Sequence, residues 1–327
     1  MRASSFLCLG QAALSLASTI RTGGNPGLVR QVSTAAVVEG NGTIQASLPS
    51  GDYVNVYLHG ATVTSWKTSD GDDKLLLSTA SALDGSAAIR GGIPVVFPNF
   101  GSPPKDHQTS GLPGHGFARN STWSFAGSEL QDDGAGVVLT FTLNSTQLSA
   151  KYQQAWPYSA GFTYTVNLTQ DNLAVHFTVE NMDTTAIDFQ FLLHTYLSVP
   201  NISTTTVSGL QGGIYQDKTL NYTVFTETAD QLSIVNETDR IYTPVSVDTP
   251  IVLNDNGQAR VTVQRSPTLP DVTVWNTWAT KILATADFAP KDAWQHYLAI
   301  EPGSVVSFTS LESGAKWEGG VQYTAHI

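Results

Sequence analysis

The chain has 327 residues, of which 41% are hydrophobic and only 13% are charged, and its net charge is −11. The acidic balance excludes a nucleic-acid-binding surface of the usual kind, which needs concentrated Lys and Arg. The apolar content is sufficient to bury a core, so a disordered chain is excluded, and the length allows a single large β domain.

Residues 1–33 differ from the rest of the chain and predict a leader. Arg2 precedes an apolar stretch at 6–17 that is too short to span a membrane and fits the central region of a secretory signal. A mitochondrial presequence is the rival, because the leader contains three arginines and no acidic residue precedes Glu39. The only cysteine, Cys8, also lies here, so the mature chain would have no disulfide, no thiolate nucleophile and no Cys-ligated zinc.

Asn-x-Ser/Thr acceptor sites for N-glycosylation are frequent. The sequence contains seven, at Asn41, Asn120, Asn144, Asn167, Asn201, Asn221 and Asn236. This number is modestly above chance for a chain so rich in Ser and Thr, and it favours the secretory pathway. We therefore expect a secreted glycoprotein, with the mitochondrion or the cytoplasm as the alternative.

From Ala36 onward the residue pattern predicts strands. Alternating or crowded apolar residues indicate strands at 53–58, 60–66, 137–143, 162–168, 173–179, 189–196, 260–264, 271–275, 294–300 and 305–311. The segment Gln170-Asp171-Asn172 separates two of them and is typical of a hairpin turn. No stretch has sustained helical periodicity. We predict one domain over 34–327, a large antiparallel β-sandwich.

Two Gly- and Pro-rich stretches predict shaped loops that carry cations. In 89–101, Arg90 is followed by two glycines and two closely spaced prolines. Arg90 could bind an anionic ligand through its fork of donors, or it could be a structural arginine bonded to loop carbonyls. In 111–120, His115 and Arg119 lie four residues apart. From this stretch alone, a turn histidine bonded to the backbone is the favoured reading of His115.

Two polar residues in apolar strands are candidates for catalysis. Alternation places His194 with Gln190 and Tyr196 on the more polar face of its strand, as expected for the lining of a cleft. Glu301 follows the apolar strand 294–300 and precedes a Pro-Gly breaker, a costly position for a carboxylate unless it is solvated, paired or used. A structural histidine and a solvated strand-end carboxylate are the plain alternatives. The residues around Asp239 by themselves predict an ordinary charged residue in a loop or a turn aspartate.

Six segments together resemble one family. They are Arg-Gly-Gly-Ile-Pro-Val-Val-Phe-Pro (90–98), His-Gly-Phe-Ala-Arg (115–119), His-Thr-Tyr (194–196), Asp-Arg-Ile-Tyr (239–242), Val-Trp-Asn-x-Trp (274–278) and Ile-Glu-Pro-Gly (300–303). In this order they resemble the hexose-6-phosphate mutarotases, a branch of the aldose 1-epimerase family. The resemblance extends from about Ala36 to the end of the chain.

The resemblance implies a galactose-mutarotase-like β-sandwich with the following residue roles. His194 matches the general acid of the family and Glu301 its general base. The matching substrate-binding residues are Arg90, Arg119, Asp239, His115 and Gly114. Gly114 stands where relatives often carry Gln, and Thr277 replaces the usual Pro of the Trp-Asn-Pro-Trp motif.

The expected reaction is interconversion of the α and β anomers of hexose 6-phosphates, glucose 6-phosphate above all, by ring opening and closure. It needs no metal and no organic cofactor, only a base and an acid on opposite sides of the sugar, and its ligand is a sugar phosphate or sugar. We expect burial to raise the pKa of Glu301 and a neighbouring carboxylate to raise that of His194. The alternatives are a secreted mutarotase of unphosphorylated aldoses and a carbohydrate-binding sandwich without activity. We expect a monomer with no membrane span.

Overall fold

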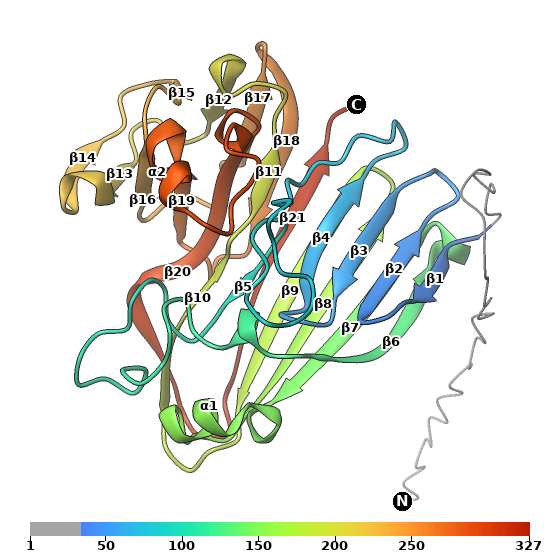
Figure 1. The fold of residues 1–327 in the computed structure, drawn as a ribbon, viewed down its shortest axis with the longest axis vertical. Coiled ribbons are helices and arrows are strands. Elements are labelled where there is room, and N and C mark those ends of the chain that lie inside the picture. The colour runs from blue at the N-terminus through green and yellow to red at the C-terminus, as the bar shows by residue number, and fades with distance from the viewer. Residues whose placement is uncertain (1–33) are drawn as a thin grey trace, which may run out of the picture.

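The computed structural model describes residues 34–327, and the predicted leader with Cys8 lies outside them. Within this range the chain is built mainly of antiparallel strands in three sheets (Figure 1). The two α-helices are short, α1 (Ala150–Ala155) and α2 (Trp278–Ala284). The predicted β architecture is therefore confirmed, whereas the boundary after residue 33 stays a prediction.

The nine-stranded sheet forms one layer of the sandwich. In sheet order its strands are β15 (Gln231–Ser233), β12 (Thr205–Ser208), β17 (Ile251–Asp255), β18 (Gln258–Arg265), β21 (Lys316–Ala325), β9 (Asn172–Asn181), β8 (Ala160–Thr169), β7 (Gly136–Asn144) and β6 (Ser124–Gln131). Strands β8 and β9 alternate strictly between buried and partly exposed residues. They are joined at the predicted turn, where Thr169 pairs with Asn172 and Asp171 adopts a φ of 56°. This hairpin is confirmed.

Two further sheets pack against this layer. The eight-stranded sheet contains β14 (Thr223–Thr226), β13 (Ile214–Asp217), β16 (Thr238–Tyr242), β19 (Asp271–Asn276), β20 (Tyr297–Leu311), β10 (Ile187–Leu193) and β5 (Val95–Val96), and β11 (Tyr196–Ser198) also pairs with β20. The four-stranded sheet contains β1 (Ala36–Glu39), β2 (Thr43–Ser47), β3 (Tyr53–Tyr57) and β4 (Thr62–Lys67).

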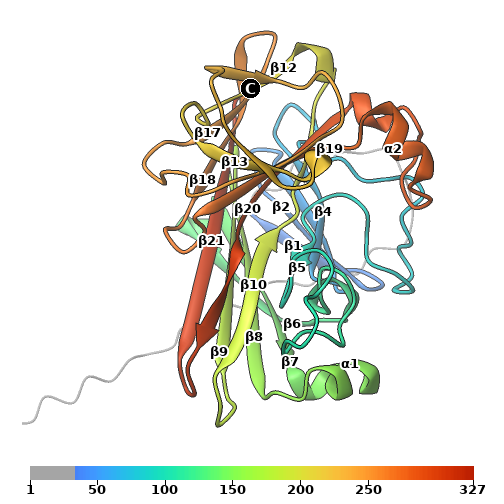
Figure 2. The same ribbon diagram turned by 90° about the vertical axis from the view of Figure 1, so that its left-hand side faces the viewer.

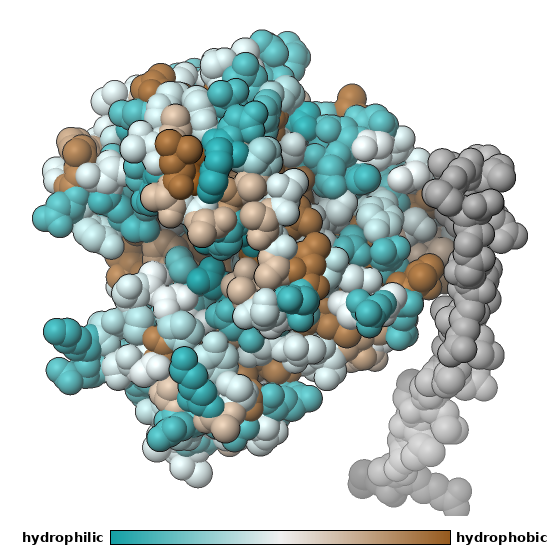
Figure 3. Space-filling view, viewed as in Figure 1, coloured by the Kyte–Doolittle hydropathy of each residue, from teal (hydrophilic) through white to brown (hydrophobic). Residues whose placement is uncertain are grey.

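Aromatic contacts form the core between the layers. Phe177 of β9 stacks on Phe191 of β10 with ring centroids 4.6 Å apart, and Trp66 of β4 lies 6.3 Å from Tyr323 of β21. Figure 1 shows β3 and β4 in front of β7–β9, and Figure 2 shows β10 and β20 alongside β8, β9 and β21. The hydrophobic residues that remain at the surface in Figure 3 form small scattered groups rather than one continuous patch.

The strand predictions around the two candidate catalytic residues were wrong in detail. Glu301 does not end a strand, because β20 continues through Pro302 and Gly303 to Leu311. The chain tolerates Pro302 because Ile300 N donates to Thr195 O, so the position of Pro302 N faces the same neighbour, where β10 gives way to β11. Correspondingly, His194 lies not inside a strand but in the break between β10 and β11.

Candidate active site

Strand register brings the two candidate catalytic residues together. Tyr196 pairs with Ala299, and Leu192 pairs with Gly303. His194 is midway between Leu192 and Tyr196, and Glu301 is midway between Ala299 and Gly303, so His194 lies opposite Glu301. On its other side, Glu301 pairs with Thr273 of β19. Because directly paired residues of an antiparallel sheet point to the same face, these side chains form one wall of a site.

His194 and Glu301 touch each other in a buried position. His194 Nδ1 lies 2.9 Å from Glu301 Oε1, and the two residues are 7% and 1% exposed. Neither atom makes a hydrogen bond of proper geometry within residues 34–327. Buried carboxylates and imidazoles are normally hydrogen-bonded, so two unsatisfied atoms in contact indicate a functional site. The contact also leaves no gap between these two atoms for a sugar, contrary to the expected arrangement of one on each side.

Aromatic rings fix the orientation of the imidazole. Tyr196 stacks on His194 with centroids 4.8 Å apart and an interplanar angle of 13°. Trp275 meets His194 edge-on at 5.5 Å. The stack confirms that His194 and Tyr196 lie on one face, as alternation predicts. Packing of this kind fixes the orientation of the ring without a hydrogen bond to it.

A second, partly buried ion pair faces the same space. Lys218 Nζ lies 3.0 Å from Asp239 Oδ2, with the side chains 23% and 10% exposed. The ammonium also lies 5.0 Å from the ring centroid of Phe100. The other carboxylate oxygen, Asp239 Oδ1, is buried and has no partner within the described part of the chain. Asp239 therefore has a free acceptor, and it belongs to β16 rather than to a loop.

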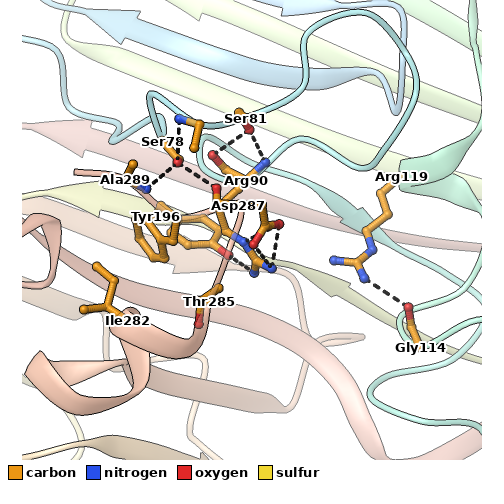
Figure 4. A network of polar contacts seen from close by, with 12 residues as sticks. Ser78, Ser81, Arg90, Gly114, Arg119, Tyr196, Ile282, Thr285, Asp287 and Ala289 are labelled. Carbon is orange, nitrogen blue, oxygen red and sulfur yellow. Dashed lines mark hydrogen bonds and ion pairs between the residues drawn. The ribbon is translucent and has the colours of Figure 1, made fainter. Parts of the chain in front are cut away.

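Arg90 lies in a network of polar contacts (Figure 4). Its Nε and Nη2 donate to the two oxygens of Asp287 at 3.1 and 3.2 Å, and its Nη1 donates to the Tyr196 hydroxyl at 3.1 Å. Asp287 follows α2 in a loop that Lys291 holds by donating to three backbone carbonyls. Arg90 is thus anchored by a carboxylate and a phenol, not by the loop carbonyls considered in the sequence reading.

Hydrogen bonds join the loops 89–101 and 111–120. His115 N donates to Gly101 O, Gly101 N donates to His115 Nδ1, and the amides of Phe117 and Ala118 donate to Phe97 O. Gly116 has a φ of 71°, and a Cβ there would collide with the Phe97 carbonyl, so this position requires glycine. The backbone bonding of His115 agrees with the sequence reading.

A pocket of about 130 Å³ joins these groups. Its lining residues are Arg90, Phe100, His115, His194, Lys218, Asp239, Thr273, Trp275 and Glu301. Five of the seven predicted site residues are among them. The other two are not among them and contact each other: Arg119 Nη2 donates to Gly114 O at 3.0 Å (Figure 4). Arg119 Nε is buried with no partner within residues 34–327.

Sequence reasoning missed several residues that line this pocket or contact its lining. Thr273 and Trp275 share the strand of a quoted motif, and alternation along that strand could have found them. Tyr196 was placed on the correct face but given no role. Lys218 lies in a one-turn 3₁₀ segment and Asp287 lies 197 residues from its partner Arg90, so no local pattern pointed to either.

Burial dominates the electrostatics of the pair. It raises the pKa of Glu301 to about 8, although Lys218, Arg90 and Arg119 act to lower it. Burial and the same three cations hold the pKa of His194 well below its ordinary value, and Asp239 opposes them only in part. The predicted rise for Glu301 agrees with this direction. The predicted rise for His194 was wrong, because desolvation and three cations outweigh one carboxylate.

Comparison with known proteins decides the family. The model of the aldose 1-epimerase family matches residues 44–324. The chain belongs to the aldose 1-epimerase family. It is 31% identical over 273 residues to a protein of Cenchrus ciliaris named "Putative glucose-6-phosphate 1-epimerase", covering 83% of this chain and 80% of that one. A protein of Escherichia coli K12 with the same name is 31% identical over 252 residues, covering 75% and 77%.

Solved structures show that this aldose 1-epimerase has the expected fold. A "putative mutarotase" of Salmonella typhimurium superimposes with a TM-score of 0.75 at 22% identity, covering 92% of this chain and 97% of that one. A "galactose mutarotase related enzyme" of Lactobacillus acidophilus gives 0.65 at 18% identity, with 90% and 97% covered. The galactose-mutarotase-like sandwich is therefore confirmed, and the family match with the 31% identical relatives confirms the isomerase class.

Two features are absent from residues 34–327. No helix there is long and apolar enough to cross a membrane. No group of three or more His, Cys, Asp and Glu side chains in this range is arranged to hold a metal ion.

Proposed function

We propose that this aldose 1-epimerase interconverts the α and β anomers of hexose 6-phosphates, with glucose 6-phosphate as the main substrate, and that His194 and Glu301 carry the proton transfers. The observation that carries the proposal is the contact between two buried, unsatisfied titratable groups at the floor of a polar pocket. A binding module without activity has no reason to bury such a pair, whose desolvation is costly. The names of the two relatives support the phosphorylated substrate.

The pair holds one exchangeable proton near neutral pH. Because the pKa of Glu301 is raised to about 8 and that of His194 is lowered, the proton lies mainly on the carboxyl group when the pocket is empty. At 2.9 Å the two atoms are close enough for a small rotation of either side chain to align them, and the proton then passes from Oε1 to Nδ1, which gives a carboxylate beside an imidazolium. These two forms share one proton and titrate as a unit. Catalysis needs the second form.

Ring opening then follows from this second form. Glu301 accepts the proton of the C1 hydroxyl while imidazolium His194 donates a proton to the ring oxygen. The bond between C1 and the ring oxygen breaks and C1 becomes an aldehyde. After rotation about the C1–C2 bond, closure returns both protons in reverse and gives the other anomer. Since Nδ1 and Oε1 contact each other, we assign the contacts with sugar to Nε2 and Oε2.

Three cations around the pocket suit a phosphate group. Arg90 and Lys218 line it, and these two residues and Arg119 all act to lower the pKa of the buried Glu301. Burial lowers the pKa of Arg119, and Arg90 lies close enough for its charge to act in the same direction. We assign the phosphate to this arginine side of the pocket and the sugar hydroxyls to Asp239 Oδ1 and Thr273 Oγ1, two buried atoms without partners in the described chain.

One observation favours a second candidate, a mutarotase of unphosphorylated aldoses. Asp287 already neutralises Arg90 through a bidentate pair, and Asp239 already pairs with Lys218. The positive charge left for a phosphate is therefore smaller than the count of cations suggests. A neutral sugar would bind through the same free hydroxyl acceptors.

The deciding experiment measures anomer exchange directly. Purified protein should speed equilibration of α- and β-glucose 6-phosphate, followed by polarimetry or by NMR exchange between the two C1 protons. Free glucose and galactose are measured in parallel. Faster turnover of the free sugars would favour the second candidate, a mutarotase of unphosphorylated aldoses. The absence of exchange with any sugar would overturn the enzymatic proposal.

We propose further that the protein is secreted and glycosylated. The acceptor residues Asn41, Asn201, Asn221 and Asn236 are exposed and accessible to modification. In contrast, Asn120 donates to Gly116 O beside Arg119 and is only partly exposed. Endoglycosidase treatment of protein from its native host should lower its mass. An unchanged mass would favour the mitochondrion or the cytoplasm.

A further inference from the structure

The geometry of Lys218 assigns it a role that rests on the function proposed above. We infer that Lys218 is a positioning residue of the epimerase reaction, which clamps Asp239 through Oδ2 so that Oδ1 stays fixed toward the sugar. Its effect on turnover would then depend on Asp239.

Local structure holds Lys218 in place. It begins a 3₁₀ turn, Lys218–Leu220, that follows β13 directly. The carboxylate of Asp217 accepts from Thr219 N at 2.9 Å and from Thr219 Oγ1 at 2.6 Å, which caps this turn. Asn221, in left-handed conformation with a φ of 55°, ends it. The backbone of Lys218 is therefore fixed at both sides, as a clamp requires.

The side chain of Lys218 is confined as well. Its ammonium lies between Asp239 Oδ2 at 3.0 Å and the face of Phe100 at 5.0 Å from the ring centroid. A cation held by a carboxylate and an aromatic face in a largely desolvated place is restrained more strongly than one at the surface. Phe100 is itself tied to the sheet, because its amide donates to Gln190 Oε1 at 2.9 Å.

The clamp leaves one half of Asp239 free. Oδ2 is occupied by Lys218, whereas Oδ1 is buried and has no partner within residues 34–327. A carboxylate with one anchored and one free oxygen is a directional acceptor for a sugar hydroxyl. Burial raises the pKa of Asp239 and Lys218 acts to lower it, so loss of the ammonium would favour the neutral carboxyl group, which accepts hydrogen bonds less strongly.

The same ammonium influences Glu301. After burial, Lys218 is the largest influence on the pKa of Glu301, ahead of Arg90 and Arg119, and it acts to lower it. The other titratable groups around Glu301 are His194 and Tyr196 from the β10–β11 segment, Asp239 from β16 and Tyr323 from β21. Because these neighbours remain in a Lys218 variant, removal of the ammonium should raise the pKa of Glu301 further.

The first test compares single variants of purified full-length protein with glucose 6-phosphate. Lys218→Met should lower kcat/KM about 10- to 100-fold, the range for losing a hydrogen bond to a charged group, and should move the alkaline limb of the pH profile to higher pH. Lys218→Arg, which keeps the charge, should restore most of the activity. Lys316→Met removes a lysine from an exposed ion pair with Glu180 and serves as the matched control with unchanged activity.

A double-mutant cycle with Asp239→Asn separates a clamp from a direct phosphate contact. For a clamp, Lys218→Met combined with Asp239→Asn should be no worse than Asp239→Asn alone when both are assayed below the alkaline limb, where the effect of Lys218 on the pKa of Glu301 does not limit the rate. Losses that multiply, or an unshifted pH profile, would overturn the inference. Melting temperatures identify any variant that fails to fold. If Lys218→Met fails to fold, the pH profile of Lys218→Arg is used to test the inference instead. If the wild-type protein exchanges no anomers, the proposed function fails first; if only Lys218→Met resembles wild type, this inference fails alone.

Discussion

The two walls of the pocket differ in how their polar groups are satisfied. On the strand wall, formed by β16, β19, β20 and the β10–β11 break, four buried polar atoms have no partner within the described residues: His194 Nδ1, Asp239 Oδ1, Thr273 Oγ1 and Glu301 Oε1. The loop wall is formed by the segments 89–101 and 111–120. Its residues Arg90 and His115 already make hydrogen bonds, to Asp287, Tyr196 and Gly101. The strand wall is thus incomplete without a ligand, whereas the loop wall is largely complete.

The contrast indicates that the two walls have different roles in the reaction. A hydrogen-bonded sheet holds unsatisfied groups at fixed positions, as acid/base chemistry requires. The loops present cations whose charge is already partly neutralised, which suits selection between substrates more than proton transfer. We therefore expect changes on the strand wall to lower kcat and changes on the loop wall to raise KM. The predictions below test this division, from the largest effect to the smallest.

Glu301→Gln should give the largest loss. The amide is nearly isosteric with the carboxyl group but cannot accept the C1 hydroxyl proton, so kcat should fall by about 10²–10⁴. NMR exchange between the anomers of glucose 6-phosphate at saturating concentration measures it. Glu318→Gln, at an exposed position of β21, is the control. A kcat that falls less than tenfold would remove Glu301 from the chemistry and break the comparison.

Arg90→Lys tests the loop wall. Lysine keeps the charge but cannot donate to both oxygens of Asp287 and to Tyr196 at once. We expect KM for glucose 6-phosphate to rise about tenfold, the loss of one hydrogen bond to a charged group, with a much smaller change in kcat. Arg260→Lys is the matched control, since Arg260 forms a similar pair with Asp72 outside the pocket. An equal rise in KM for free glucose would show that Arg90 does not sense the phosphate.

The sequence predicted the architecture and most of the pocket because those depend on repeated local patterns. Alternation in β8 and β9 and the turn at Asp171 follow from side-chain period and turn chemistry. The wrong boundaries lie at the site itself. Alternation could not show that β10 ends before His194, and Pro302 looked like a strand breaker although its neighbouring strand is interrupted at that point.

Long-range contacts were beyond the sequence patterns. Arg90 could be recognised as an important cation, but its partner Asp287 comes from a loop far along the chain. Likewise, nothing local distinguishes Lys218 from an exposed turn lysine; its partner Asp239 is brought near only by the pairing of β13 with β16. The direction in which the pKa of His194 shifts depends on burial and on the sum of these charges. It could not be derived until the positions of the charged groups were known.

The pH profile should show the single proton of the strand wall. Above about pH 8 the raised pKa of Glu301 is passed, the pair loses its last exchangeable proton, and kcat/KM should fall about tenfold per pH unit. The phosphate of the substrate titrates near pH 6, so only the alkaline limb is diagnostic. Initial rates from pH 6 to 10, after subtraction of the uncatalysed rate, provide the measurement. A constant kcat/KM up to pH 10 would contradict the shared proton.

The smallest expected effect is on stability and follows from the same shift. A carboxyl whose pKa rises on folding, from 4.5 to about 8, binds more protons in the folded protein. Its contribution to stability is therefore lost as the pH rises through that window, whereas glutamine does not titrate. Glu301→Gln should gain about 2–6 °C in melting temperature relative to wild type between pH 5 and pH 9. An equal difference at both pH values would mean that Glu301 is ionised in the folded protein, and the strand wall would then be satisfied without a ligand.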